Sequence, residues 1–312
     1  MISLRYHVIS IGAVFLALAL GVVLGSTALS DRLLSGVSAD RTRLEQHVTD
    51  LQEDNDALRA RLVDAAAFAA VIGPRVVRET LQGRTIVLVT TSDANPVDRD
   101  GLIALLRSAG ATVTGEVQLT DAFTDPARSD QLIELTTRLL PAGTQLPTAP
   151  DVGTLTGGLL GSLLLLDPTT GAASASPDQT ATVLAGFGDG GFLQAGPRVQ
   201  PAQLAVVLTG PAAAGHGSGD RAGILARFAT QLDRSSAGVV LAGPPGSAHP
   251  SGALGVVRAD TAATSVLSTV DGVDSPSGQI ATVLALAEQA EGRAGRYGTA
   301  GNADAVVPAL AR

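Results

Sequence analysis

The sequence lacks several residue types that carry much of protein chemistry. It contains no cysteine, and all of its 21 basic residues are arginine. The absence of cysteine excludes disulfide bonds, thiolate catalysis, iron–sulfur clusters and cysteine-ligated zinc. The absence of lysine excludes a P-loop lysine and a Schiff base. Met1 is the only methionine, so soft sulfur ligands for copper(I) are lacking as well. We therefore predict neither an enzyme nor a cofactor site, and assign no metal ligands.

Positive charge and aromatic residues are also scarce. Aromatic residues make up 3% of the chain. The formal net charge is -8, which argues against nucleic acid as a partner. Hydrophobic residues reach 45% and charged residues only 16% over 312 residues. This composition predicts a folded protein with a sizeable core and room for about two domains.

An uncharged segment lies near the N-terminus, from Val8 to Ser30. It is long enough to cross a lipid bilayer as a helix, so residues 1–30 are predicted to form a transmembrane anchor. Arg5 precedes the segment, which places the N-terminus in the cytoplasm and the bulk of the chain outside, with the anchor in the inner membrane. The alternative is a cleaved signal peptide, because small residues occur at Ser26-Thr27-Ala28.

Residues 31–73 carry an apolar heptad repeat, with Asp31 as the predicted helix cap and Gly73-Pro74 as the predicted end. A single asparagine in the seam favours a two-stranded parallel form, so we predict a homodimeric coiled-coil stalk. The alternative is a helix that packs on its own domain through the same face. The predicted dimerisation seam consists of Leu34, Val37, Leu44, Val48, Leu51, Asn55, Leu58 and Leu62.

Residues 83–292 alternate strand-like and helix-like patterns, which indicates an extracytoplasmic α/β domain with a mostly parallel, Rossmann-like sheet. Residues 293–312 are predicted to be a C-terminal tail, and 141–161 a flexible excursion. Expected strands are 85–91, 111–119, 161–166, 205–209 and 238–242. Expected helices are 100–109, 131–140, 178–187, 221–232 and 277–291.

A polar turn follows the first of these strands. Ligands of parallel sheets bind at the carboxyl ends of the strands, so Asp93, Asn95 and Asp98 are a candidate ligand crevice. The competing interpretation, which we favour, is turn chemistry with a helix cap at Asp98 or Asp100.

Two glycine-rich segments suggest chemistry only by composition. Gly186–Gly191 follows a helix rather than a strand, so we interpret it as a helix end. His216, Ser218 and Asp220 are too close in sequence to form a catalytic triad. His216 and His249 could still meet in the fold as imidazole ligands.

Both ends of the chain resemble one family. MISLRYHVIS with the apolar run that follows it, and GRYGTAG at Gly295–Gly301, resemble the actinobacterial copper transport protein B family, MctB. The resemblance also takes in GRTIVLV at Gly83–Val89, LPAG at Leu140–Gly143 and STVDGVD at Ser268–Asp274, so it covers essentially the whole chain. The family tail usually reads Tyr-Gly-Thr-Gly, and here Ala300 intervenes.

The resemblance implies an envelope protein needed for copper efflux and low intracellular copper, proposed to form an outer-membrane pore in mycobacteria. It also implies an alternative, because related corynebacterial proteins are linked to cell separation through a membrane partner that controls peptidoglycan hydrolases. The residues themselves favour an inner-membrane homodimer whose distal domain docks an envelope protein partner, with no direct copper coordination.

Overall fold

The chain is described by a computed structural model that covers residues 4–215 and 217–309, without the side chains of residues 4, 26–40 and 42. It divides into two units, Met1–Ala65 and Ala66–Arg312, which are treated separately below.

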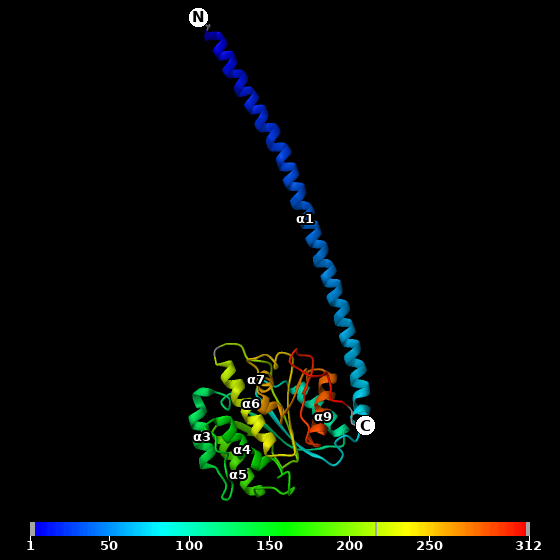
Figure 1. Cartoon of the computed structure of the whole chain (residues 1–312), viewed down its shortest axis with the longest axis vertical. Coiled ribbons are helices and arrows are strands. Elements are labelled where there is room, and N and C mark those ends of the chain that lie inside the picture. Colours follow the sequence, from blue (N-terminus) through cyan, green and yellow to red (C-terminus); the bar gives the residue numbers. More distant parts are fainter. Residues whose placement is uncertain (1–3, 216, 310–312) are drawn as a thin grey trace. The chain divides into compact units, whose positions relative to one another are not determined.

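A single helix, α1, runs without interruption from Leu4 to Val76 (Figure 1). Its N-terminal part, Arg5–Gly25, is long and apolar enough to cross a membrane, as predicted. The predicted start at Asp31 is wrong, because that residue lies inside the helix. The helix also continues two residues past Pro74, where Val77 N donates a hydrogen bond to Gly73 O at 3.0 Å.

The second unit contains a seven-stranded sheet with the order β3-β2-β1-β4-β5-β6-β7. All neighbouring strands are parallel except the β2–β3 pair, so the prediction of a mostly parallel sheet is confirmed. The chain adds β2 and β3 on one side of β1, and then adds β4 to β7 on the other side. The position between β1 and β4 is therefore the switch point of this sheet. The strands are β1 Thr85–Thr91, β2 Thr112–Leu119, β3 Leu193–Ala195, β4 Leu204–Leu208, β5 Val239–Gly243, β6 Ser268–Asp271 and β7 Arg296–Tyr297.

Helices cover both faces of the sheet, so each central strand is buried on both sides. In β1, Ile86 and Leu88 pack into a core with α2 and α9, whereas Val87 and Val89 pack into a core with α3 to α7. Figure 1 shows the second group of helices on one side of the strands and α9 on the other. The helices are α2 Pro96–Ser108, η1 Pro126–Arg128, α3 Ser129–Arg138, α4 Val152–Leu164, α5 Pro177–Asp189, α6 Ser218–Arg234, α7 Ala253–Ala259, α8 Thr261–Thr264 and α9 Pro276–Gln289.

Most predicted elements are confirmed, but the strand predicted at 161–166 is wrong. Residues 161–164 form the last turn of α4, and Leu165 and Leu166 make only isolated bridges to Ala202 and Ala173. The helix also fills the second half of the predicted flexible excursion at 141–161. The reason is close helix packing: a Cβ at Gly157 would lie 2.8 Å from Phe228 O of α6. A fully buried apolar run does not reveal whether it is helix or strand, and α4 is buried almost all round.

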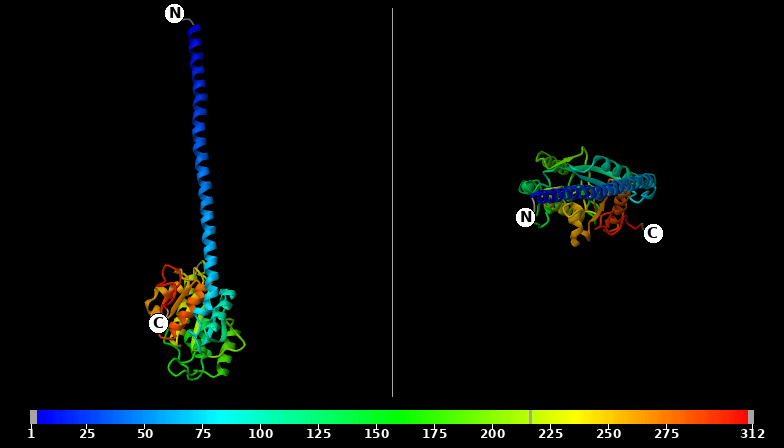
Figure 2. Two further views of the ribbon diagram at one scale, coloured as in Figure 1. Left: turned by 90° about the vertical axis from the view of Figure 1, so that its right-hand side faces the viewer. Right: turned by 90° about the horizontal axis from the view of Figure 1, so that it is seen from above.

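Three strands were not predicted from the sequence: β3, β6 and β7. The last of these, Arg296–Tyr297, comes from the segment 293–312 and pairs with β6. Figures 1 and 2 show the last part of the chain, orange to red, gathered at one side of the domain. The C-terminal segment therefore forms the β7 edge of the sheet.

Candidate functional site

A crevice lies at the switch point, between the segments that follow β1, β2, β4 and β5. Its volume is about 490 Å³, which is in the range of small-molecule sites. This is the edge at which parallel sheets bind their ligands. The lining residues are Thr91, Ser92, Asp93, Thr120, Asp121, Thr124, Thr209, Pro211, Ala212, Ala213, Ala214, Ser218, Arg221, Ala222, Leu225, Ser251, Gly252 and Ala253.

Asp93 is the one predicted crevice residue that lines this space. Its Oδ1 accepts hydrogen bonds from Thr91 Oγ1 and from the backbone N–H of Gly210, at 3.3 Å. A Cβ at Gly210 would overlap the carboxylate. Asp93 thus joins the end of β1 to the end of β4 beside the crevice.

Asn95 and Asp98 lie apart from the crevice lining. Asn95 Oδ1 accepts the backbone N–H of Val97 at 2.8 Å and caps α2. The cap predicted at Asp98 or Asp100 is therefore one turn too late. Asp98 is 7% exposed on α2, and burial, then the nearby charge of Asp274, raises its pKa. The turn chemistry that we favoured thus explains Asn95, whereas Asp98 is a buried residue of α2 and does not cap it.

The sequence prediction missed the other charged groups of the crevice, Asp121 after β2 and Arg221 in α6. Asp121 accepts a hydrogen bond from Ser92 Oγ. Arg221 is only loosely held, with Nη2 at 3.8 Å from Asp125 Oδ1 and Nη1 at 3.4 Å from Asp121 O. The available signal in the sequence was the presence of polar residues directly after the strands. Which of these residues lie close together could be predicted only from the strand order.

The glycine-rich loop between β4 and α6 opens onto the same crevice through Ser218. Gly217 precedes α6 with φ 79°, and no side chain caps this helix start. His216 lies outside the described residues, so its predicted meeting with His249 is untested. His249 Nδ1 lies 2.9 Å from Ser251 Oγ. Across the described part of the chain, no three His, Cys, Asp or Glu side chains gather as metal ligands would.

The predicted dimerisation seam lies on α1. The described seam side chains between Leu44 and Leu62 are solvent-exposed in the single chain, from 46% at Val48 to 70% at Leu62. Asn55 is exposed too, whereas the side chains of Leu34 and Val37 lie outside the described residues. Exposed leucines at heptad spacing are what an unpaired seam presents.

Within the second unit, the heptad pattern continues into contacts with the chain's own domain. Ala69 and Ile72 are half-buried and Gly73 is buried. A Cβ at Gly73 would lie 3.0 Å from Ile280 Cδ1 and 3.7 Å from Leu105 Cδ1. The alternative that the helix packs on its own domain is therefore correct for this last part.

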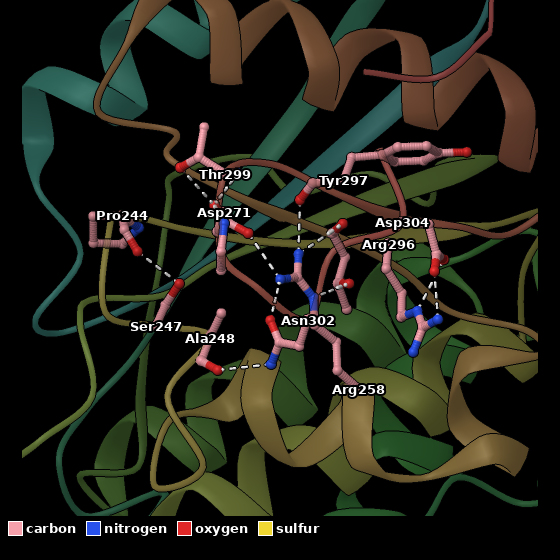
Figure 3. Close-up of polar contacts among 12 residues, drawn as sticks. Pro244, Ser247, Ala248, Arg258, Asp271, Arg296, Tyr297, Thr299, Asn302 and Asp304 are labelled. Atoms are coloured by element: carbon pink, nitrogen blue, oxygen red, sulfur yellow. Dashed lines mark hydrogen bonds and ion pairs between the residues drawn. The ribbon is translucent and has the colours of Figure 1, made fainter. Parts of the chain in front are cut away.

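The C-terminal motif Gly295–Gly301 is held by a buried ion pair (Figure 3). Arg258 Nη1 lies 2.8 Å from Asp271 Oδ2, and their side chains are 1% and 3% exposed. Arg258 also donates to Tyr297 O at 2.7 Å and to Asn302 Oδ1 at 2.8 Å. Burial lowers the pKa of Arg258, and the hydrogen bond to Asp271 opposes that shift.

The other oxygen of Asp271 binds the motif backbone. Oδ1 accepts the N–H groups of Thr299 at 2.7 Å and Ala300 at 3.1 Å. Gly298 has φ 127°, and a Cβ there would overlap the same carboxylate. The additional residue of the motif, Ala300, is thus accommodated because its backbone N–H also donates to Asp271. The motif is a clamp that fastens the C-terminal segment to the sheet.

Comparison with known proteins gives consistent matches along the chain. A family model described as "Copper transport outer membrane protein, MctB" matches residues 1–308. Proteins named copper transporter MctB from Mycobacterium bovis and Mycobacterium tuberculosis are 39% identical over 290 residues. The protein of that name from Mycobacterium leprae is 35% identical over 293 residues. Each of these matches covers 92% of both chains.

Proposed function

Because this chain belongs to the MctB family of copper transport proteins, as its two ends predicted, we propose that it helps to keep intracellular copper low from a membrane-anchored position. We propose further that it does not coordinate copper itself, and that an envelope protein docked on the α/β domain carries the metal. The observation that carries this proposal is the donor set, since the chain has no cysteine and methionine only at position 1. Copper(I) sites are built from these sulfur ligands.

The proposed anchor is the span Arg5–Gly25, which crosses the inner membrane once with a cytoplasmic N-terminus. The matching family description names the outer membrane instead. Fractionation of native envelopes distinguishes the two: we expect the chain in inner-membrane fractions. Recovery in outer-membrane fractions, with channel conductance from the purified protein alone, would contradict the proposal.

The copper proposal predicts that all 4 histidines are dispensable. A chain carrying His7→Asn, His47→Asn, His216→Asn and His249→Asn should restore copper tolerance to a deletion strain as fully as the wild-type chain. Purified full-length protein should show no stoichiometric copper binding in competition with a chelator.

Histidine-dependent binding together with loss of tolerance would overturn the copper proposal. Microscopy of the deletion strain adds a second readout. Unseparated cells with normal copper tolerance would favour the role in cell separation instead.

We also propose that α1 pairs in parallel with a second copy through the exposed seam between Leu44 and Leu62. Asn55 would lie opposite its counterpart and select the two-stranded form, at a cost in stability. Leucine at this position should raise the melting temperature of the oligomer, change its size, or both. Light scattering and thermal melting of the full chain in detergent measure the two effects.

Glu53→Leu is the matched control for Asn55→Leu, because Glu53 lies on the side of α1 opposite the seam and is exposed. It should change neither the oligomer size nor the melting temperature. An Asn55→Leu protein with unchanged size and no added stability would show that the seam is wrongly assigned.

A further inference from the structure

We propose that the crevice at the switch point binds an acidic sugar, meaning a polyhydroxylated ring that carries a single carboxylate or phosphate group. The inference is independent of the copper role, because it concerns only the residues that line the crevice. It starts from polar groups there that the fold leaves without partners.

Thr209 is the first such group. It follows β4, lines the crevice and is only 6% exposed. Its hydroxyl makes no hydrogen bond with any residue that the structure describes, and its oxygen is not among the fully buried unpaired atoms. The hydroxyl is therefore accessible from the crevice and free to bond a ligand there.

The start of α6 and Arg221 provide a place for one anionic group. The first turns of α6 face the crevice through Ser218, Arg221, Ala222 and Leu225. The helix has 17 residues and no side-chain cap, so its first N–H groups are free for a ligand. Arg221 reaches Asp125 only at 3.8 Å, so its guanidinium can turn to a carboxylate or phosphate.

Asp93 and Asp121 limit the ligand's charge and suggest its other groups. Both carboxylates line the crevice, and Arg221 is the only arginine among the lining residues that the structure describes. They would repel a second anionic group but accept hydrogen bonds from neutral hydroxyls. The hydroxyls of Thr124 and Ser218 add donors and acceptors.

The composition of the lining disfavours a nucleotide. The volume of about 490 Å³ has room for a sugar ring with its anionic group. No Phe, Tyr, Trp or His occurs among the lining residues that the structure describes, so these offer a base nothing to stack on. One anionic group, several hydroxyls and no aromatic ring describe an acidic sugar.

Calorimetry on the full chain, held in a detergent without a sugar headgroup, tests the proposal with four probes. They are glucuronate, glucose 6-phosphate, glucose and inorganic phosphate. We expect glucuronate, glucose 6-phosphate or both to bind at least about tenfold more tightly than glucose and phosphate, since charge-assisted hydrogen bonds contribute that much. Which acidic sugar binds more tightly identifies the anionic group.

Two substitutions locate the binding. Arg221→Gln should reduce the affinity for the acidic sugar to that for glucose, and Thr209→Val, which keeps the side-chain shape, should weaken it about tenfold. Arg234→Gln, at the other end of α6 and outside the crevice, should change nothing. The near-ultraviolet signal of the buried Tyr297 verifies folding of each variant.

Several results would overturn the inference. They are no binding of any probe up to about 10 mM, equal binding of glucose and glucuronate, or phosphate binding as tightly as the acidic sugars. An equal loss of affinity in Arg234→Gln would also contradict it, because that residue does not line the crevice.

Discussion

Replacing Arg258 with methionine should lower the free energy of unfolding of the α/β domain by about 3–5 kcal/mol. The substitution removes one partner of a buried ion pair and leaves the carboxylate of Asp271 without its charge partner. Breaking a buried pair in this way is costly because the remaining charge stays desolvated. The domain also loses the bonds from Arg258 to Tyr297 O and Asn302 Oδ1, which hold the C-terminal segment.

Urea denaturation, followed through the tyrosine signal, measures this loss of stability. The chain has only two tyrosines; Tyr297 is buried beside the ion pair, whereas Tyr6 is 71% exposed. The near-ultraviolet circular dichroism of Tyr297 therefore reports unfolding of this domain without interference from α1.

The matched control for Arg258→Met is Arg138→Met. Arg138 pairs with Glu134 at the surface of α3, where both side chains are mostly exposed. Its loss should change the stability by less than about 1 kcal/mol. Similar small effects at both positions would show that the clamp does not stabilise the domain. The double variant with Asp271→Asn should recover part of the loss, since it removes the unpaired charge.

The second large effect concerns pH. Asp233 of α6 is 8% exposed, and burial raises its pKa to about 7, against the opposing effects of the Val239 N–H and Arg234. The folded protein therefore holds this proton more tightly than the unfolded chain. The stabilisation is fully present below the unfolded pKa of 3.8 and is lost as the pH rises through about 7.

Replacing Asp233 with asparagine should abolish this part of the pH dependence. The wild-type domain should lose up to about 1.4 kcal/mol for each pH unit between about pH 4 and 7, and about 3–4 kcal/mol in all because the slope is smaller near each pKa, relative to the variant. Asparagine keeps an oxygen for the Val239 N–H, which the wild-type carboxyl accepts at 2.8 Å. Urea denaturation at several pH values measures the difference.

Asp178→Asn provides the control for Asp233→Asn, because Asp178 lies in the first turn of α5 and is exposed. It should leave the slope of stability against pH unchanged between about pH 5 and 7. Parallel pH curves for the wild-type and Asp233→Asn proteins would contradict the prediction.

The apolar patterns were enough to predict the main layout of the chain. The span near the N-terminus, the heptads of α1 and the buried strands β1, β4 and β5 all follow from where hydrophobic residues recur. Each of these elements buries or exposes a whole face, so the spacing of its hydrophobic residues along the sequence shows which face that is. The family was recognisable from the two ends of the chain for the simpler reason that long motifs are specific.

The candidate site was predictable only in part. The turn after β1 pointed to Asp93, which lines the crevice, but also to Asn95 and Asp98, which serve α2. Arg221 and Thr209 come from other segments and meet Asp93 only because β4 lies next to β1 in the sheet. The strand order, which the sequence does not state, assembles the crevice.

Only the tertiary structure decided the elements whose burial depends on distant partners. The strand β6 reads Ser-Thr-Val-Asp and is fully buried because Arg258 binds Thr269 and Asp271, while Gln289 binds Ser268. The helix α4 required α6 to approach its glycines closely. The sequence by itself determined the long apolar span, the heptads and the apolar strands, because hydrophobicity is a property of each residue. Polar burial and close helix contact need a specific partner, and folding alone brings that partner into place.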